Sequence, residues 1–285
     1  MKKIVTEYFE NLESRMGYKF FLKGAQHFGL YNPELKISNE REAQKHHHDT
    51  LVNSLNTNKK QKILDIGCGQ GIVATDIAKR YKLKVTGLDL TPYMIQQAKL
   101  QAKKNNVGDL TKFKIGNYQE MPFEKDSFDA CYGVETLSHA TDLNKALAEI
   151  YRVVKPNGKC VFFEYKIKNI EKMSKREKFY YELVKEGSSM SSLDRFINEG
   201  FEKTLKKEGF TNIQSINLTP MAIKSFHRLY RYALIPYQAI KLFSLQKKFI
   251  NTTAAVEYFN MTQKGYLNYY LHTAETPSKK GKRHR

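Results

Sequence analysis

A glycine-rich turn between a strand and a helix constrains this chain more than any other segment. The apolar run 63–66 has the composition of a buried strand, and residues 72–79 have the apolar spacing of a helix. Between them, other residues alternate with Gly67, Gly69 and Gly71. Glycine lets the backbone turn tightly and lie directly against a ligand. The segment therefore predicts the first strand–turn–helix unit of a nucleotide-binding α/β domain.

The spacing of these glycines distinguishes two kinds of ligand. A dinucleotide site has the pattern G-x-G-x-x-G, with the pyrophosphate at the helix N-terminus. Here the pattern is G-x-G-x-G, and Asp65 precedes the turn. A carboxylate there repels a pyrophosphate but can receive an ammonium group. This resembles motif I of the class I S-adenosylmethionine-dependent methyltransferases, whose cofactor has an amino acid end and no phosphates. A purely structural turn or a site for another nucleotide is the alternative.

A second acid follows at the end of the next candidate strand, 84–89. Asp89 falls 18 residues beyond Gly71, close to the spacing at which such an acid meets ribose hydroxyls. Two carboxylate oxygens can accept both hydroxyls at once. The alternative is a solvated acid at a strand end. Thr91 and Pro92 then have the character of an N-cap and first helical residue, which predicts a helix to about Asn105.

Length and composition indicate one large α/β core with appendages. The chain has 285 residues, of which 41% are apolar, and a formal net charge of +19. This charge would suit anionic lipid, nucleic acid or an acidic substrate, while a lysine-rich compositional bias is the plain alternative. No apolar run reaches transmembrane length and the N-terminus lacks a secretory segment, so we expect a cytoplasmic protein, with peripheral membrane contact left open. Three cysteines without zinc-type pairing predict a reducing compartment.

The order of segments predicts the domain organisation. Residues 1–57 have a helical pattern and form an N-terminal cap, interrupted by a loop near 29–33. Residues 58–276 alternate strands and helices, which is typical of a parallel sheet. Its expected strands are 63–66, 84–89, 112–115, 128–134, 159–165, 211–218 and 266–274. A helix is expected to open over 142–150 and to stop before Pro156, and a second helix is expected over 193–209. A turn is expected over 155–158, and helical insertions over about 168–208 and 221–262. The basic tail 277–285 is expected to be disordered.

Polar residues gather at the ends of the expected strands. Ligands of open α/β sheets bind at the carboxyl ends of the strands. Five polar side chains lie at or after such ends: Asp65, Asp89, Asn117, Glu135 and His139. Their convergence predicts a binding site at this edge.

Three longer segments carry a more specific resemblance. Residues 134–142, 149–158 and 163–165 are similar to the sterol 24-C-methyltransferase branch of the class I methyltransferases. The resemblance implies a Rossmann-like sheet of seven mostly parallel strands with an antiparallel C-terminal hairpin. It also implies S-adenosylmethionine bound by Asp65, Gly67, Gly69, Gly71, Asp89, Leu90, Asn117, Tyr118 and Glu135. The chain departs from the family at Asn117, where the family has Asp, at Tyr165, where it has Trp, and over 221–262.

The chemistry implied by this resemblance is methyl transfer to a small hydrophobic acceptor, sterol or isoprenoid-like. For an alkene acceptor, aromatic faces stabilise the cation and Glu135 or His139 takes the proton. For a quinone, phenol or amine acceptor, the same pair would act as a base for O- or N-methylation. An RNA methyltransferase is less favoured, because the Asn-Pro-Pro-Tyr type of motif is absent after the fourth strand. The sequence leaves the oligomeric state open and points to no specific nucleic acid.

Each candidate residue also has a structural interpretation. Glu135 could hold the polar end of the cofactor, and His139 or Glu164 could serve only as hydrogen-bonded structural residues. The triplet 46–48 cannot place three rings on one helix face, so we expect no metal site there. The basic and aromatic segment 226–235 could line an apolar pocket or lie on a membrane surface.

Overall fold

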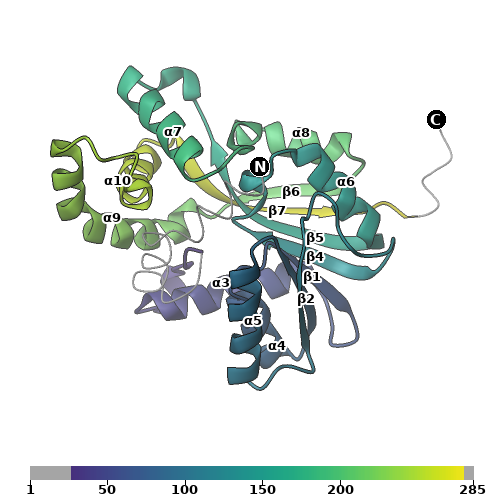
Figure 1. The fold of residues 1–285 in the computed structure, drawn as a ribbon. Helices are drawn as coiled ribbons and strands as arrows, with labels where there is room; N and C mark the ends of the chain where they lie inside the picture. Colours follow the sequence, from purple (N-terminus) through teal and green to yellow (C-terminus); the bar gives the residue numbers. More distant parts are fainter. Residues whose placement is uncertain (1–26, 279–285) are drawn as a thin grey trace.

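A computed structural model describes residues 27–278, whose centre is a seven-stranded sheet with the order β3-β2-β1-β4-β5-β7-β6 (Figure 1). The first five strands are parallel to one another, whereas β7 pairs antiparallel with both β5 and β6. The sheet therefore has the class I topology that the sequence predicts. The strands are β1 (Lys62–Ile66), β2 (Lys84–Asp89), β3 (Thr111–Ile115), β4 (Phe128–Val134), β5 (Val154–Ile167), β6 (Thr211–Asn217) and β7 (Leu267–Glu275).

Helices cover both faces of the sheet. The first group packs on one face and consists of α3 (Glu40–Leu55), α4 (Ile72–Tyr81) and α5 (Pro92–Lys104). The other face is covered by α6 (Leu143–Val153) and α8 (Gly200–Lys207). Alternate side chains of a strand point to opposite faces. Accordingly Ile63 lies in the core beneath α3 and α4, while its neighbour Leu64 lies in the core beneath α6.

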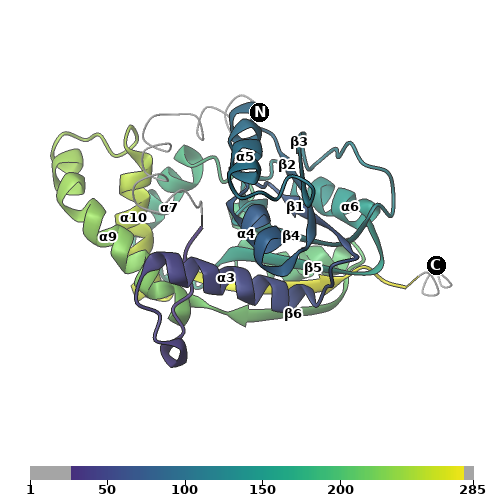
Figure 2. The same ribbon diagram turned by 90° about the horizontal axis from the view of Figure 1, so that it is seen from below.

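A helical insertion separates the last two strands. It consists of α9 (Thr219–Leu242) and α10 (Ile250–Gln263), which pack against each other and against α7 (Lys175–Gly187). Both views show this group beyond one end of the sheet, on the side away from the C-terminus (Figures 1 and 2). The chain returns from α10 directly into β7, so the insertion sits next to the carboxyl ends of the parallel strands.

Two local expectations were wrong. Residues 155–158 do not form a turn that precedes a strand, because they lie within β5. Asn157 has a φ of 61° there, and the β4–β5 register shifts between Phe128 and Ala130, so the chain forms an irregularity inside the strand. The helix expected over 193–209 is divided into a 3₁₀ turn at Leu193–Phe196 and α8, because Asn198 between them has a φ of 52°.

The terminal expectations are tested only in part. The helices expected within 1–26 lie outside the described residues, as do residues 279–285 of the tail 277–285 that is expected to be disordered. Within the described part of the expected cap, α3 packs onto the sheet through Leu51 and Leu55. No helix between residues 27 and 278 is long and apolar enough to cross a membrane.

Candidate cofactor and active site

The glycine turn lies between β1 and α4 and approaches its neighbours too closely for any side chain. Gly67 and Gly71 have φ values of 69° and 70°, a region that side chains disfavour. A Cβ added to Gly67 would lie 1.9 Å from Oγ1 of Thr136. The Gly67 amide donates to the carbonyl oxygen of Leu88 at 2.8 Å, which fixes the turn to β2. The turn thus presents backbone, as a ligand cradle requires.

Asp65 occupies the floor of a pocket beside this turn. Its side chain is buried, and burial raises the pKa of its carboxyl to about 7, against a smaller lowering by the Tyr132 hydroxyl. A cationic group in the pocket would favour the ionised carboxylate. The pocket is lined by His27, Asp65, Gly67, Cys68, Gln70, Ile72, Val73 and Val134. The Asp65 carboxylate, as a hydrogen-bond acceptor with negative charge, therefore fits the ammonium group at the amino acid end of S-adenosylmethionine.

Asp89 joins the glycine turn to the next loop. Its Oδ2 accepts a hydrogen bond from the Gly69 amide at 2.9 Å, and its Oδ1 accepts one from the Thr91 amide at 2.9 Å. A carboxylate offers about four lone-pair sites, so each oxygen can accept a further donor. This is the arrangement that a pair of ribose hydroxyls would need.

The three remaining cofactor candidates lie on neighbouring loops. Leu90 is partly buried directly after Asp89. Asn117 uses its side-chain carbonyl to accept from the Gln119 amide at 2.9 Å, so this oxygen already stabilises its own turn. The Tyr118 hydroxyl donates to the carbonyl oxygen of Thr136 at 3.1 Å, which ties the loop after β3 to the loop after β4.

Glu135 combines an unusual backbone conformation with a buried, hydrogen-bonded carboxyl. It directly follows β4 with a φ of 51°, a conformation that non-glycine residues rarely adopt and that concentrates at functional sites. Its carboxyl accepts hydrogen bonds from the Tyr165 and Tyr269 hydroxyls, both at 3.0 Å, and from the Phe28 amide at 3.1 Å. Burial nevertheless raises its pKa to about 7, because desolvation outweighs these three donors. The carboxyl can therefore gain or lose a proton near neutral pH.

Glu164 lies at the same edge but is bound differently. It is completely buried, and its Oε1 accepts from the Thr136 and Leu137 amides at 2.8 and 2.5 Å. Burial raises its pKa to about 8. Glu164 thus fixes the backbone that directly follows Glu135, which favours its structural interpretation.

His139 belongs to a different hydrogen-bond network from Glu135. It lies in a short 3₁₀ turn, Leu137–His139, and its Nδ1 donates to the carbonyl oxygen of Ser189 at 3.2 Å. Burial lowers its pKa to about 4, so the ring is neutral near pH 7. The expectation that Glu135 or His139 takes the proton stays a prediction, and of the two it is Glu135 whose carboxyl is bonded to two tyrosines.

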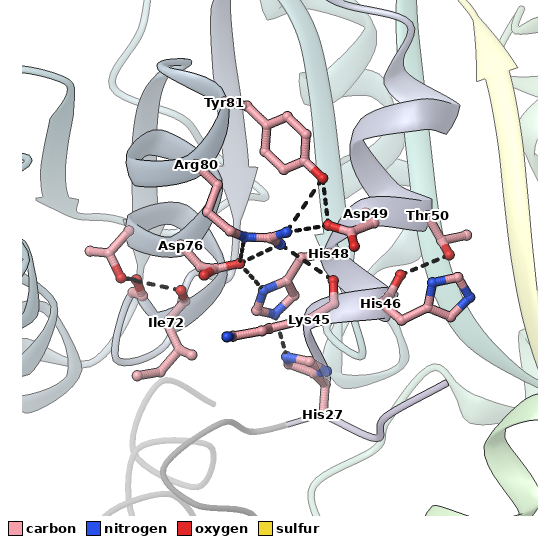
Figure 3. A network of polar contacts seen from close by, with 12 residues as sticks. His27, Lys45, His46, His48, Asp49, Thr50, Ile72, Asp76, Arg80 and Tyr81 are labelled. Atoms are coloured by element: carbon pink, nitrogen blue, oxygen red, sulfur yellow. Dashed lines mark hydrogen bonds and ion pairs between the residues drawn. The ribbon is translucent and has the colours of Figure 1, made fainter. Parts of the chain in front are cut away.

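His27 and two histidines of α3, His47 and His48, form contacts that the sequence could not specify. The Nε2 atom of His27 lies 3.0 Å from Nε2 of His48, whose Nδ1 lies 2.6 Å from Oδ2 of Asp76 (Figure 3). Arg80 donates to the same Asp76 oxygen. The third histidine, His47, places its Nε2 atom 3.1 Å from the Tyr269 hydroxyl. His47 and His48, which are neighbours in α3, thus belong to two hydrogen-bond networks. His48 lies in the network beside the cofactor pocket, and His47 contacts Tyr269 in the network at Glu135.

Asp76 anchors the first network as a carboxylate. Burial would raise the pKa of Asp76, but its contacts with His48 and Arg80 outweigh burial and hold this pKa at about 2. Burial lowers the pKa of His27 to about 3, so its ring is neutral near pH 7. The Nδ1 atom of His27 donates to the carbonyl oxygen of Phe28 at 2.9 Å.

Comparison with known proteins agrees with this geometry. A family described as a methyltransferase domain matches residues 64–162. The S-adenosyl-L-methionine-dependent Diels-Alderase iccD of Talaromyces variabilis is 31% identical over 94% of this chain and 91% of its own length. The 24-methylenesterol C-methyltransferase 2 of Arabidopsis thaliana is 30% identical over 66% of this chain. This chain spans about half of that relative, or 52%. Among solved structures, the [4+2]-cyclase SpnF aligns with a TM-score of 0.77 at 17% identity, covering 98% of this chain and 97% of its own.

These findings define the class of protein. The chain belongs to the class I S-adenosylmethionine-dependent methyltransferases, and its cofactor is S-adenosylmethionine. Within that family it resembles the sterol 24-C-methyltransferase branch, as the residues around Glu135 predict.

Proposed function

We propose that this chain transfers a methyl group from S-adenosylmethionine to an unsaturated carbon of a small hydrophobic acceptor, sterol or isoprenoid-like. The observation that carries the proposal is the Glu135 carboxyl, held by two tyrosine hydroxyls among aromatic rings. Phe28 lies 4.1 Å from Phe226 and 6.0 Å from Tyr269 between ring centroids, and Tyr165 lies 6.1 Å from Tyr269. The similarity to sterol C-methyltransferases supports the same acceptor class.

The division of labour at the site follows from these residues. When bound, S-adenosylmethionine supplies an electrophilic methyl group, and the electron pair of the broken bond stays on its sulfur. Asp65, the glycine turn and Asp89 would hold it. Methylation of a double bond leaves a positive charge on the acceptor, which the faces of Phe28, Tyr165 and Tyr269 stabilise as aromatic rings stabilise other cations.

Glu135 completes the reaction as a base. Removal of a proton from the carbon next to the cation restores a neutral alkene, and the Glu135 carboxylate accepts that proton. With a pKa of about 7, a large share of this carboxyl is ionised at neutral pH, while its basicity exceeds that of an ordinary glutamate. Neutral His139 is a positioning residue in this proposal, since its ring bonds the backbone at Ser189.

A labelled-methyl assay tests the proposal. The protein is incubated with S-adenosylmethionine carrying a radioactive methyl group and with lipid or aqueous extracts. Label on a carbon of an organic-soluble product, lost in Glu135→Gln, is the expected result. Label on an oxygen or nitrogen would favour the quinone, phenol or amine alternative, and label only in water-soluble products or RNA would overturn the hydrophobic acceptor.

A [4+2] cyclisation is the second candidate, because a relative covering nearly this whole chain is named a Diels-Alderase. Such a cyclisation forms two carbon–carbon bonds from existing π bonds, so it consumes no methyl group and releases no proton. The two candidates differ in one measurable product. Methyl transfer yields S-adenosylhomocysteine in step with product, whereas cyclisation leaves S-adenosylmethionine intact.

A further inference from the structure

The far end of the α9–α10 pair carries an exposed apolar surface. Tyr232, Ile235 and Leu242 are three, seven and ten residues apart along α9, which places them on one helix face. Ile235 and Leu242 are 81% and 78% exposed, and the surface continues into the following turn at Phe243 and Leu245. We call Tyr232, Ile235, Leu242, Phe243 and Leu245 the apolar tip. Side chains of this size rarely gather in the open without a binding partner.

The sequence segment that carries the apolar tip has charges of one sign. No Asp or Glu occurs in the sequence between Glu208 and Glu257. The same stretch contains six basic residues, of which Arg231, Lys241, Lys247 and Lys248 are exposed beside the tip. A basic and apolar surface of this kind complements a layer with acidic headgroups above hydrocarbon.

We propose that the apolar tip docks on an anionic lipid surface, with only the C-terminal end of α9 and the following turn in the interface. A second copy of this chain fits less well, because two such surfaces would bring their basic residues together. A nucleic acid would pair with the lysines and arginines but would leave the large aliphatic side chains in water. None of the helices between residues 27 and 278, α9 included, is long and apolar enough to cross a membrane, so the proposed contact is made at the lipid surface.

The same helix connects the apolar tip to the candidate active site. In the N-terminal part of α9, the ring centroid of Phe226 lies 4.1 Å from that of Phe28, and the Phe28 amide donates to the Glu135 carboxyl. At a rise of about 1.5 Å per residue, Ile235 lies about 14 Å and Leu242 about 24 Å further along the axis. A docked tip would hold the carboxyl roughly one helix length from the bilayer, which suits delivery of a lipophilic acceptor. Docking itself does not depend on the acceptor proposed above.

Vesicle binding of the full chain tests this inference. The chain contains no tryptophan, so Phe243→Trp introduces a single fluorescent reporter at the apolar tip. With phosphatidylcholine vesicles that contain phosphatidylglycerol, we expect a blue shift of its emission and co-sedimentation that weakens with salt. Ile235→Asp and Leu242→Asp should each weaken binding at least about tenfold, the loss expected from one buried aliphatic side chain.

Control variants distinguish docking through the apolar tip from other causes of vesicle binding. Leu100→Asp alters an apolar residue that is 54% exposed on α5, and it should leave vesicle binding unchanged. Binding of S-adenosylhomocysteine by all variants verifies folding. Vesicle binding that survives Ile235→Asp and Leu242→Asp would overturn the inference, because the basic tail 279–285 would then suffice. Absence of vesicle binding, together with RNA binding or with self-association that Ile235→Asp abolishes, would overturn it as well. If the methyl-transfer assay fails but the chain binds vesicles through the apolar tip, the proposed function is wrong and the docking inference is still supported.

Discussion

Two neighbouring regions, the candidate cofactor site at Asp65 and Asp89 (the cofactor edge) and the surroundings of the Glu135 carboxyl, differ in how far apart their residues lie in the sequence. At the cofactor edge, Asp65, Gly67 and Asp89 come from two neighbouring strands within 25 residues of sequence. Around Glu135, the donors are Phe28, Tyr165 and Tyr269, the farthest of which is 134 residues away along the chain. The first site depends on local backbone geometry and the second on the completed fold. Substitutions should therefore affect binding at one and proton transfer at the other.

The largest expected effect is that of Glu135→Gln, which should separate cofactor binding from proton transfer. Glu135→Gln keeps the side-chain shape but removes the base, so methyl transfer to the acceptor should fall about 10²- to 10⁴-fold. Affinity for S-adenosylhomocysteine, measured by calorimetry, should change little. If affinity falls and the single-turnover rate does not, Glu135 is a cofactor ligand and the contrast between the two regions is lost.

Asp89→Ala tests the cofactor edge. It removes a carboxylate that accepts from Gly69 and Thr91 and that would receive the ribose hydroxyls. Charge-assisted hydrogen bonds of this kind contribute about 1.5–3 kcal/mol each. We expect calorimetry to show S-adenosylhomocysteine binding weakened about 100-fold. Asp109→Ala, which alters an exposed acid, is the control, and equal losses in both variants would contradict the assignment.

Stability as a function of pH tests the burial of Glu164. Its pKa is about 8 in the folded protein, above its ordinary value of 4.5, so between these values the folded state binds a proton that the unfolded state lacks. The free energy of unfolding must therefore fall as pH rises through this range. Relative to Glu164→Gln, the wild type should lose about 3 kcal/mol between pH 5 and pH 8. Urea unfolding curves measure this difference, and parallel pH dependences would show that Glu164 does not titrate as proposed.

The smallest effect concerns the tyrosine at Glu135. The Tyr165 hydroxyl favours the charged carboxyl, so Tyr165→Phe should raise the pKa of Glu135 by about one unit. Because the base must be ionised, the rate of methyl transfer rises with pH through about 7, and this limb should move to higher pH in the variant. Tyr151→Phe, a change packed against Phe210 on the other face, should leave the profile in place.

The sequence predicted most of the sheet because the signals for its strands are local. β2 and β4 have the predicted bounds, and the other strands differ mainly at their ends. The turn expected at 155–158 was wrong because Asn157 tolerates a positive φ within the strand. Glycine at position 158 also fits there, since a Cβ would lie 2.3 Å from Val154. Turn-forming residues alone do not distinguish a loop from an irregular strand.

The candidate site was predictable in its residues but not in its partners. Glu135 and Tyr165 were identified from the sequence by family resemblance, whereas Tyr269 carried no signal beyond an apolar strand pattern. The sequence shows the histidine triplet 46–48, but the separate hydrogen-bond networks of His47 and His48 depend on how α3 packs against β5 and α4. Hydrogen bonds between distant segments exist only once the sheet has formed.

The close approach of Gly67 to Thr136 has a consequence for redesign. Because a side chain at position 67 would collide with Thr136, the turn proposed to cradle the donor and the loop that carries the proposed base restrict each other's side chains. A library that randomises position 67 alone would mostly produce collisions with Thr136. Varying positions 67 and 136 jointly, with smaller residues at 136 admitted, is the route by which new acceptor preferences could be selected without losing the cradle.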